Sequence, residues 1–233
     1  MRFAVFSDIH ANLEALTKVL ARAYELEADL LVCLGDVVGY GPFPNECTEL
    51  VRQRCAIIVQ GNHDAGAAGG RDPGQFNPEG EAALVWTRSV LSRANREFLL
   101  NLPRSVVSYN VTFIHASPRN PSGWEYISTW DTGTKMFEHF ATAYCCIGHT
   151  HIPSIVAADG TVNSIREGQK HLINVGSVGQ PRDGNPRASF ALLDTETSAA
   201  SIIRVEYDLS ATAAAIRQAG LPEFLAKRLQ YGI

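Results

Sequence analysis

The chain has 233 residues, of which 45% are hydrophobic and 19% charged, and its formal net charge is −4. This composition fits one large globular domain or two small ones, and the absence of any basic block excludes the electrostatic footprint of a protein that binds duplex nucleic acid. The N-terminus has no signal-peptide features and no apolar run reaches the roughly 18 residues of a membrane span, so we expect a cytoplasmic protein, away from membranes, whose five cysteines are reduced.

The first part of the chain alternates between short apolar runs and amphipathic segments. Alternation of strand and helix is typical of parallel strand pairing with right-handed crossovers. The helix after the first strand has apolar residues at the spacing of one helix face, with Asn12 as its N-cap. The elements expected here are strand 2–7, helix 12–26, strand 29–36, helix 44–51 and strand 56–62.

Residues 65–103 break this alternation. The glycine-rich segment 65–76 has the composition of a mobile loop. Asn77-Pro78 then provides an N-cap with proline at the first helical position, and a second, shorter helix follows the first. We therefore predict that 65–103 is a helical insertion above the sheet, within a single domain that spans 1–233.

The rest of the chain consists mainly of strands. Asp159-Gly160 is a strong hairpin turn signal, and two short helices close the chain. This order suits two facing sheets with helices outside, the first mostly parallel and the second mostly antiparallel. The elements expected here are a hairpin or bend over 105–115, a polar loop over 117–130, a helix over about 132–141 and strands at 144–148, 154–159, 161–166, 171–177, 188–194 and 201–207.

Five polar motifs each follow an apolar run, where we expect a strand to end. Ligands of an open α/β sheet bind in the crevice outside the carboxyl ends of the strands. The sequence therefore predicts that these motifs converge, although they are far apart along the chain. The motifs are Asp8-Ile9-His10, Gly35-Asp36, Gly61-Asn62-His63-Asp64, His115 and Gly148-His149-Thr150-His151.

The converging groups would be carboxylates, one asparagine and several imidazoles. Carboxylates packed together without a cation repel one another and their pKa values rise. Divalent cations remove this repulsion, and mixed nitrogen and oxygen ligands suit Zn²⁺, Mn²⁺ or Fe. Because there are too many ligands for one ion, we predict two ions that share a carboxylate bridge, at the roughly 3.5–4 Å spacing of two-metal hydrolytic sites.

The motif set resembles the signature of the calcineurin-like metallophosphoesterase superfamily, which reads DxH, GDxx(x)G, GNHD/E, a lone His and GHxH. All five motifs are present in that order, and DVVGYGPFPNEC and INVGSVGQPRD resemble a bacterial branch of small phosphoesterases. The resemblance implies a four-layer α-β-β-α sandwich of two mixed sheets. It also implies a phosphoesterase that uses two divalent ions (Mn²⁺, Zn²⁺, Fe²⁺ or Fe³⁺, or Ni²⁺) and a hydroxide held between them to hydrolyse a small phosphomonoester or phosphodiester, such as a nucleotide.

The resemblance also implies a role for each motif residue. Asp36 matches the carboxylate that bridges the two metals. The implied ligands of the first metal are Asp8, His10 and His151. The implied ligands of the second metal are Asn62, His115 and His149.

His63 matches the histidine of the family that contacts the phosphate or protonates the leaving group. Asp64 would orient His63 through a hydrogen bond. Asn62, His63 and Arg182 are the candidate substrate contacts, because the guanidinium of Arg182 could hold a phosphate with a bidentate fork. The alternative for Arg182 is an ion pair with the adjacent Asp183.

Other conspicuous residues have structural interpretations. Cys145 and Cys146 could be zinc ligands or a redox pair, but on a buried strand we favour their role as small apolar residues. Trp124, Tyr126 and Trp130 could stack on a base, and we favour packing against the domain's own apolar edge. His139 and His171 lie outside the motifs and are expected to be structural.

Three other functions compete with a small-molecule phosphoesterase. A serine/threonine protein phosphatase would have an arginine in GDxVDRG, where this chain has Tyr40. A non-catalytic protein-binding scaffold of the same fold would lack the catalytic histidine, whereas His63 is present. A dinucleoside polyphosphate hydrolase fits the same motifs. The sequence indicates a small phosphoester as partner and leaves the natural substrate, the native metal and the oligomeric state open.

Overall fold

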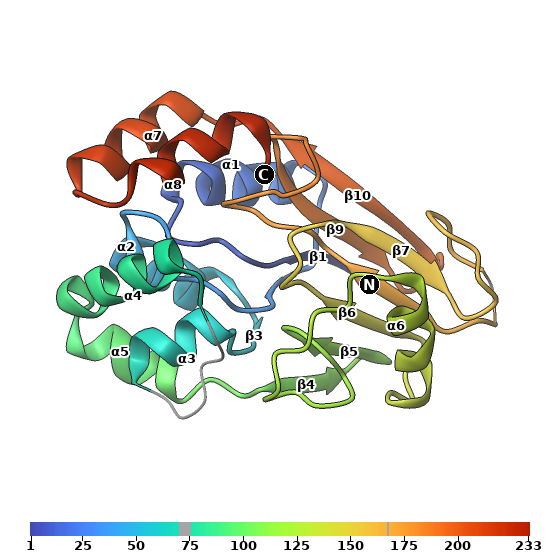
Figure 1. Ribbon diagram of the computed structural model, residues 1–233. Helices are drawn as coiled ribbons and strands as arrows, with labels where there is room; N and C mark the ends of the chain where they lie inside the picture. The colour runs from blue at the N-terminus through green and yellow to red at the C-terminus, as the bar shows by residue number, and fades with distance from the viewer. Residues whose placement is uncertain (70–75, 167) are drawn as a thin grey trace.

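Two five-stranded sheets pack face to face, with helices on the outer face of each (Figure 1). The structure is a computed structural model that describes residues 1–69, 76–166 and 168–233. Helices α1 (Leu13–Glu25) and α2 (Pro44–Arg54) cover the first sheet, and α6 (Trp130–Lys135) with the 3-10 turn that follows it covers the second. The four-layer α-β-β-α sandwich implied by the sequence is confirmed.

The first sheet contains the N-terminal strands and the last two strands of the chain. Its strands are, in spatial order, β10 (Ala199–Val205), β9 (Ala188–Asp194), β1 (Arg2–Phe6), β2 (Leu30–Cys33) and β3 (Ile57–Ile58). The pairs β1–β2 and β2–β3 are parallel, whereas β1–β9 and β9–β10 are antiparallel. The prediction of a mostly parallel sheet is wrong, because the β9–β10 hairpin returns from the far end of the chain to extend the edge beside β1.

The second sheet is equally mixed. Its strands are, in spatial order, β4 (Ser105–Ser108), β5 (Val111–Ile114), β6 (Tyr144–Ile147), β8 (His171–Asn174) and β7 (Ser154–Ala157). The expected β4–β5 hairpin is present, but β5, β6 and β8 run parallel, so the prediction of a mostly antiparallel sheet is wrong. The expected strand over 161–166 is reduced to a single bridge between Val156 and Val162, because the chain beyond the turn at Gly160 leaves the sheet.

Alternation along each strand divides its side chains between two apolar layers. Phe3 and Val5 of β1 face Phe113 of β5 between the sheets. Cys146 faces this inner layer, whereas Cys145 faces the outer layer beneath α6. The two thiols are free and point to opposite faces of the sheet, in agreement with their interpretation as buried apolar residues.

The segment between β3 and β4 is helical. Its helices are α3 (Asn62–Ala68), α4 (Pro78–Val90) and α5 (Arg93–Leu100). Asn77 caps α4 as expected, since its side chain accepts a hydrogen bond from the Gly80 N–H. The loop predicted over 65–76 is wrong for residues 65–68, which are helical, and residues 70–75 lie outside the described part of the chain. The interpretation of 65–103 as an insertion in a single domain stays a prediction.

The chain closes with two short helices, as predicted. Helices α7 (Leu209–Gln218) and α8 (Glu223–Arg228) are followed by a 3-10 turn, η2 (Leu229–Tyr231). Apolar residues of these elements and of α4 surround Tyr40 in a small core of their own. The predicted helix over 132–141 is shorter, with α6 followed by the 3-10 turn η1 (Met136–Glu138). Among the described residues, no helix is both long enough and apolar enough to cross a membrane.

Candidate metal centre

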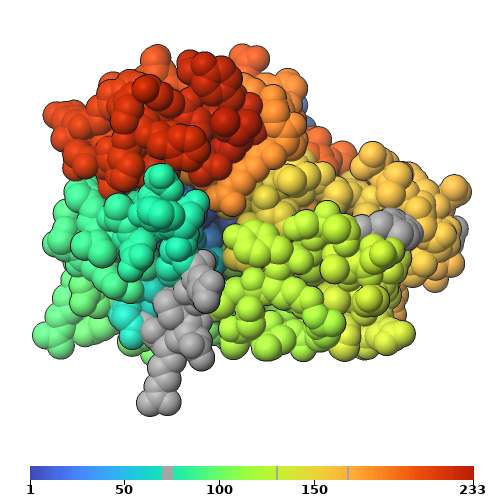
Figure 2. Space-filling model, in the orientation of Figure 1, coloured from blue at the N-terminus to red at the C-terminus, as the bar shows by residue number. Residues whose placement is uncertain are grey.

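The five polar motifs meet at the ends of strands β1, β2, β3, β5 and β6. Figure 2 shows N-terminal residues, in blue, in a hollow bordered by the C-terminal residues in red and orange, the teal-green residues and the yellow-green residues. The motif side chains are buried, none more than 5% exposed. They are Asp8, His10, Asp36, Asn62, His63, Asp64, His115, His149 and His151.

Tight turns at the strand ends direct these side chains to one point. Five motif residues have φ angles in the left-handed region, which costs a residue other than glycine about 1–3 kcal/mol. These φ angles are 55° at Asp8, 49° at His10, 51° at Asp36, 65° at His149 and 63° at His151. Gly148 allows the turn after β6 to approach β1 closely, because a Cβ atom there would collide with Ser7. Backbone strain that is maintained at so many adjacent positions is typical of a ligand-binding site.

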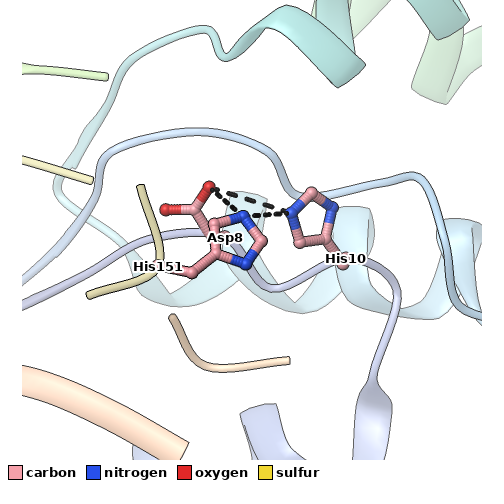
Figure 3. Close-up of side chains that lie close together, drawn as sticks. All are labelled: Asp8, His10 and His151. Carbon is pink, nitrogen blue, oxygen red and sulfur yellow. Dashed lines mark hydrogen bonds and ion pairs between the residues drawn. The ribbon is translucent and has the colours of Figure 1, made fainter. Parts of the chain in front are cut away.

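Asp8, His10 and His151 form the first group of possible metal ligands (Figure 3). The Nε2 atoms of His10 and His151 are 3.1 Å apart. Oδ1 of Asp8 lies 3.2 Å from Nε2 of His151 and 3.8 Å from Nε2 of His10. The other carboxylate oxygen of Asp8 accepts a hydrogen bond from the His149 N–H, which fixes the orientation of the carboxylate.

Asp36, His115 and His149 form the second group. Nε2 of His115 lies 3.2 Å from Nδ1 of His149 and 3.4 Å from Oδ2 of Asp36. The same Asp36 oxygen is 3.8 Å from Nε2 of His10, so this carboxylate lies between the two groups. Asn62 comes from the start of α3, and its buried Oδ1 has no hydrogen-bond partner.

In its neutral form, each of the four histidines of the two groups directs a lone pair to the centre, because its other ring nitrogen faces a backbone carbonyl. These carbonyls are Val38 at 3.2 Å from His10, Leu34 at 2.9 Å from His115, Trp124 at 3.0 Å from His149 and Gln180 at 2.5 Å from His151. A carbonyl can only accept, so the nitrogen beside it carries the hydrogen and fixes the tautomer.

Such an arrangement needs a cation. The inward nitrogens of His10 and His151 cannot hydrogen-bond to each other if both are unprotonated, and at 3.1 Å their lone pairs repel. Oδ1 of Asp8 and Oδ1 of Asn62 are also buried without a hydrogen-bond donor. Inward lone pairs on nitrogen and oxygen, oriented by carbonyl partners on the outside, are the donor set that borderline divalent metals take. The residues of this site therefore fit divalent cations.

The pKa values of three of the four histidines suit the binding of metal by neutral imidazole, and that of His115 does not. Burial lowers the pKa of His10 well below its usual value and that of His149 to about 3. Burial and then the charge of Arg182 lower the pKa of His151. Burial also acts to lower the pKa of His115, but the adjacent carboxylates of Asp36 and Asp8 outweigh it and raise this pKa to about 9.

We therefore expect a divalent cation to displace a proton when it binds to chelator-treated protein. His115, with its pKa of about 9, is protonated at neutral pH, and a metal must take the place of that proton. Calorimetric titration with Mn²⁺ in two buffers of different ionisation enthalpy should show release of about one proton. An H139A variant, which loses an exposed histidine, should show the same release. Heats of binding that do not depend on the buffer would contradict the protonation of His115 in the metal-free protein.

His63 lies beside the two groups and forms a third candidate group with His10 and Asp36. Its ring is 4.9 Å from that of His10 and 4.5 Å from that of Tyr40, and its backbone N–H donates to Oδ1 of Asp36. Burial lowers the pKa of His63 to about 4. In the sequence, Tyr40 is notable only because serine/threonine protein phosphatases have an arginine at this place. Its contact with His63 depends on the turn of the GDVVGYG loop, which no local pattern indicates.

The predicted hydrogen bond between Asp64 and His63 is wrong. The Asp64 carboxylate accepts hydrogen bonds from three backbone N–H groups, those of Gly61, Val37 and Val38, at 3.1, 2.9 and 3.2 Å. Nδ1 of His63 is buried without a hydrogen-bond partner. Asp64 occupies the first turn of α3, where its carboxylate turns back toward the start of its own helix. It therefore fastens the loop of Asp36 to the loop of His63.

Arg182 faces the centre without its expected counter-ion. Asp183 forms an ion pair with Arg204, so the alternative of an Arg182–Asp183 pair is wrong. The Arg182 guanidinium lies 5.8 Å above the ring of Tyr40 and donates to Oε1 of Gln180, while its Nε is buried without a partner. This cation is available to an anion at the site.

The aromatic loop residues divide between packing and exposure. Trp124 is 7% exposed and packs against Ala65 and Ala116, as the packing interpretation expected. Tyr126 is 54% exposed and stacks on the ring of His149, with ring centroids 4.0 Å apart. The side chain of Trp130 lies outside the described part of the structure. Neither Cys145 nor Cys146 belongs to a candidate ligand group among the described residues.

Comparison with known proteins gives consistent matches over the whole chain. The family model described as the calcineurin-like phosphoesterase superfamily domain matches residues 1–198. "Uncharacterized protein MJ0912" of Methanocaldococcus jannaschii is 40% identical over 98% of this chain and 97% of that protein. A metallophosphoesterase from Sphaerobacter thermophilus is 39% identical, with a TM-score of 0.89 over 100% of this chain and 99% of that chain. Hypothetical protein PH1004 of Pyrococcus horikoshii OT3 shares the fold at 24% identity, with a TM-score of 0.84 over 100% of this chain and 98% of that chain.

Proposed function

The chain belongs to the calcineurin-like phosphoesterase superfamily, and we infer that it is a dinuclear-metal-dependent hydrolase of small phosphomonoesters or phosphodiesters. The observation that carries this proposal is the arrangement of four imidazoles in two facing pairs. The inward nitrogens of the two pairs are 3.1 and 3.2 Å apart, and the outer nitrogen of each ring faces a backbone carbonyl. Two cations between these pairs would satisfy every inward lone pair. We place the activity in the cytoplasm, in line with the free thiols.

The donor atoms divide into two sets that share Asp36. We assign Asp8, His10 and His151 to one cation and Asn62, His115 and His149 to the other, with Mn²⁺, Zn²⁺, Fe²⁺, Fe³⁺ or Ni²⁺ as candidates. Bound there, divalent cations lower the pKa of water and neutralise charge on the phosphoryl oxygens.

His63 and Arg182 supply the contacts that the cations do not. A ring nitrogen of His63 lies within 4.8 Å of ligand atoms of His10 and Asp36, close enough to act on a phosphoester bound at the centre. The negative charge of such a phosphoester raises the pKa of His63 from its low value, which favours the proton that the leaving oxygen needs. Arg182 would hold a phosphoryl oxygen through its free Nε–H. Asp64 fastens the loop of Asp36 to the loop of His63 through hydrogen bonds from backbone N–H groups.

A substrate panel tests the proposal. The protein is stripped with a chelator, loaded separately with Mn²⁺, Zn²⁺, Ni²⁺ or Mg²⁺, and assayed with p-nitrophenyl phosphate and bis(p-nitrophenyl) phosphate. We expect turnover with at least one metal and none in the chelator, and the ratio of the two rates separates monoester from diester preference. If the protein binds metal but hydrolyses neither ester with any of the four, the proposal fails.

A further inference from the structure

A cavity of about 230 Å³ lies between α6 and the outer face of the second sheet. Ile127 and Gly133 line it from one side, and Thr150, Ile152 and Leu172 line it from the other. Among the described residues, none that lines the cavity is charged. Its volume is below the roughly 300 Å³ at which pockets for drug-sized ligands begin, so it has room for one ring system.

The cavity adjoins the metal centre through a stacked pair of rings. Tyr126 stacks on His149 with an interplanar angle of 29°. Directly after Tyr126 the chain continues into the cavity wall at Ile127, and directly after His149 it continues into the opposite wall at Thr150. Tyr126 and His149 are therefore each followed directly by a residue of the cavity wall, and more than half of the surface of Tyr126 is accessible.

Several polar groups of the cavity are already engaged within the protein. The Asn174 amide donates to Gly148 and Thr150 and accepts from the Gly176 N–H. The hydroxyl of Thr129 is paired with that of Thr132. With no free charge and few free hydrogen-bonding groups, this wall offers mainly apolar contact. An uncharged ring fits it, and a second phosphate would be desolvated there without a partner.

We propose that the substrate carries an uncharged aromatic ring, which stacks on Tyr126 and enters this cavity while the phosphoester lies at the metal centre. The inference rests on the proposed function and names its substrate class. Stacking of a planar ring on an aromatic side chain gives sequence-independent affinity of the kind that proteins use for bases, without any hydrogen-bond readout. The cavity is thus a specificity site, and the metal centre remains the site of bond cleavage.

Two phosphonates that the enzyme cannot hydrolyse test the proposal by binding alone. Benzylphosphonate and methylphosphonate share the phosphonate head group and differ in the ring. Calorimetric titration of the Mn²⁺-loaded protein should give a dissociation constant for benzylphosphonate that is at least about tenfold lower than that for methylphosphonate. G133L should remove this preference and leave methylphosphonate binding unchanged. A Cβ atom at Gly133 would have only Ile127 within contact distance, at 3.9 Å, so the position accepts a side chain beside the cavity.

Y126A should also reduce the preference, whereas Y24A, which removes a tyrosine 87% exposed on α1, should keep it. Circular dichroism melts confirm that each variant is folded. Equal affinities of the wild type for the two phosphonates would overturn the inference, and so would an unchanged preference in folded G133L. If the wild type binds neither phosphonate and hydrolyses no ester, the proposed function falls, and this inference falls with it.

Discussion

Substitution of Asp36 by asparagine should lower phosphoester turnover about 1,000-fold and reduce the bound metal by about one equivalent. Oδ2 of Asp36 lies near histidines of both ligand groups, 3.4 Å from His115 and 3.8 Å from His10. A neutral amide cannot balance two cations at this point. A loss of about 4 kcal/mol of transition-state stabilisation corresponds to the expected factor.

The substitution is designed to spare the fold. Asparagine has the size of aspartate and keeps an Oδ1 that can accept a hydrogen bond from the backbone N–H of His63. The loops that contain residues 36 and 63 should therefore remain in place. Metal content is measured by elemental analysis of the purified variant, and turnover is measured with the better p-nitrophenyl ester. D131N, which neutralises an exposed carboxylate on α6, is the matched control and should retain both. Full activity of D36N would exclude a bridging role.

Substitution of His63 by alanine should leave both metals bound and reduce turnover at least tenfold, because general acid catalysis typically supplies roughly 10²–10⁴-fold. His63 contacts the ring of His10 but belongs to neither of the two groups assigned as ligands. Its removal should therefore affect the chemical step and spare metal affinity. H139A, at an exposed histidine far from the motifs in sequence, is the control.

The leaving group distinguishes proton donation from a merely structural role. Phenolate needs a proton more than p-nitrophenolate does, so the loss in H63A should be greater with phenyl phosphate than with p-nitrophenyl phosphate. If both esters lose the same factor, His63 positions the phosphate and does not protonate the leaving oxygen. If turnover does not change, His63 has no part in the mechanism.

The sequence predicted the convergence of the motifs because strand ends in an α/β sheet share one edge, and this inference needs no knowledge of register. The mixed sheets could not be predicted in the same way. The pairing of β9 with β1 joins Leu193 to Phe3, and no local pattern specifies a contact between residues so far apart in the chain. The positions of the motifs therefore predicted which residues form the site, but they did not predict how the strands of the sheets pair.

The detailed contacts of the site were harder to predict than its members. The carbonyls that fix the histidine tautomers belong to the backbone of residues such as Val38 and Gln180, whose side chains carry no signal of this role. Asp64 was misassigned because proximity in sequence to a catalytic histidine suggested a hydrogen bond. The geometry of the first turn of α3 directs its carboxylate to backbone N–H groups instead.

The packing of the C-terminal helices around Tyr40 constrains how this protein can diverge. Ile216 and Leu225 lie beyond residue 198, where the match to the family model ends, yet they share a core with a residue of the Asp36 loop that touches His63. Mutations on the two sides of this contact should therefore be inherited together. In a set of homologues, the residue at position 40 should therefore covary with those at positions 216 and 225, which lie in the C-terminal helices.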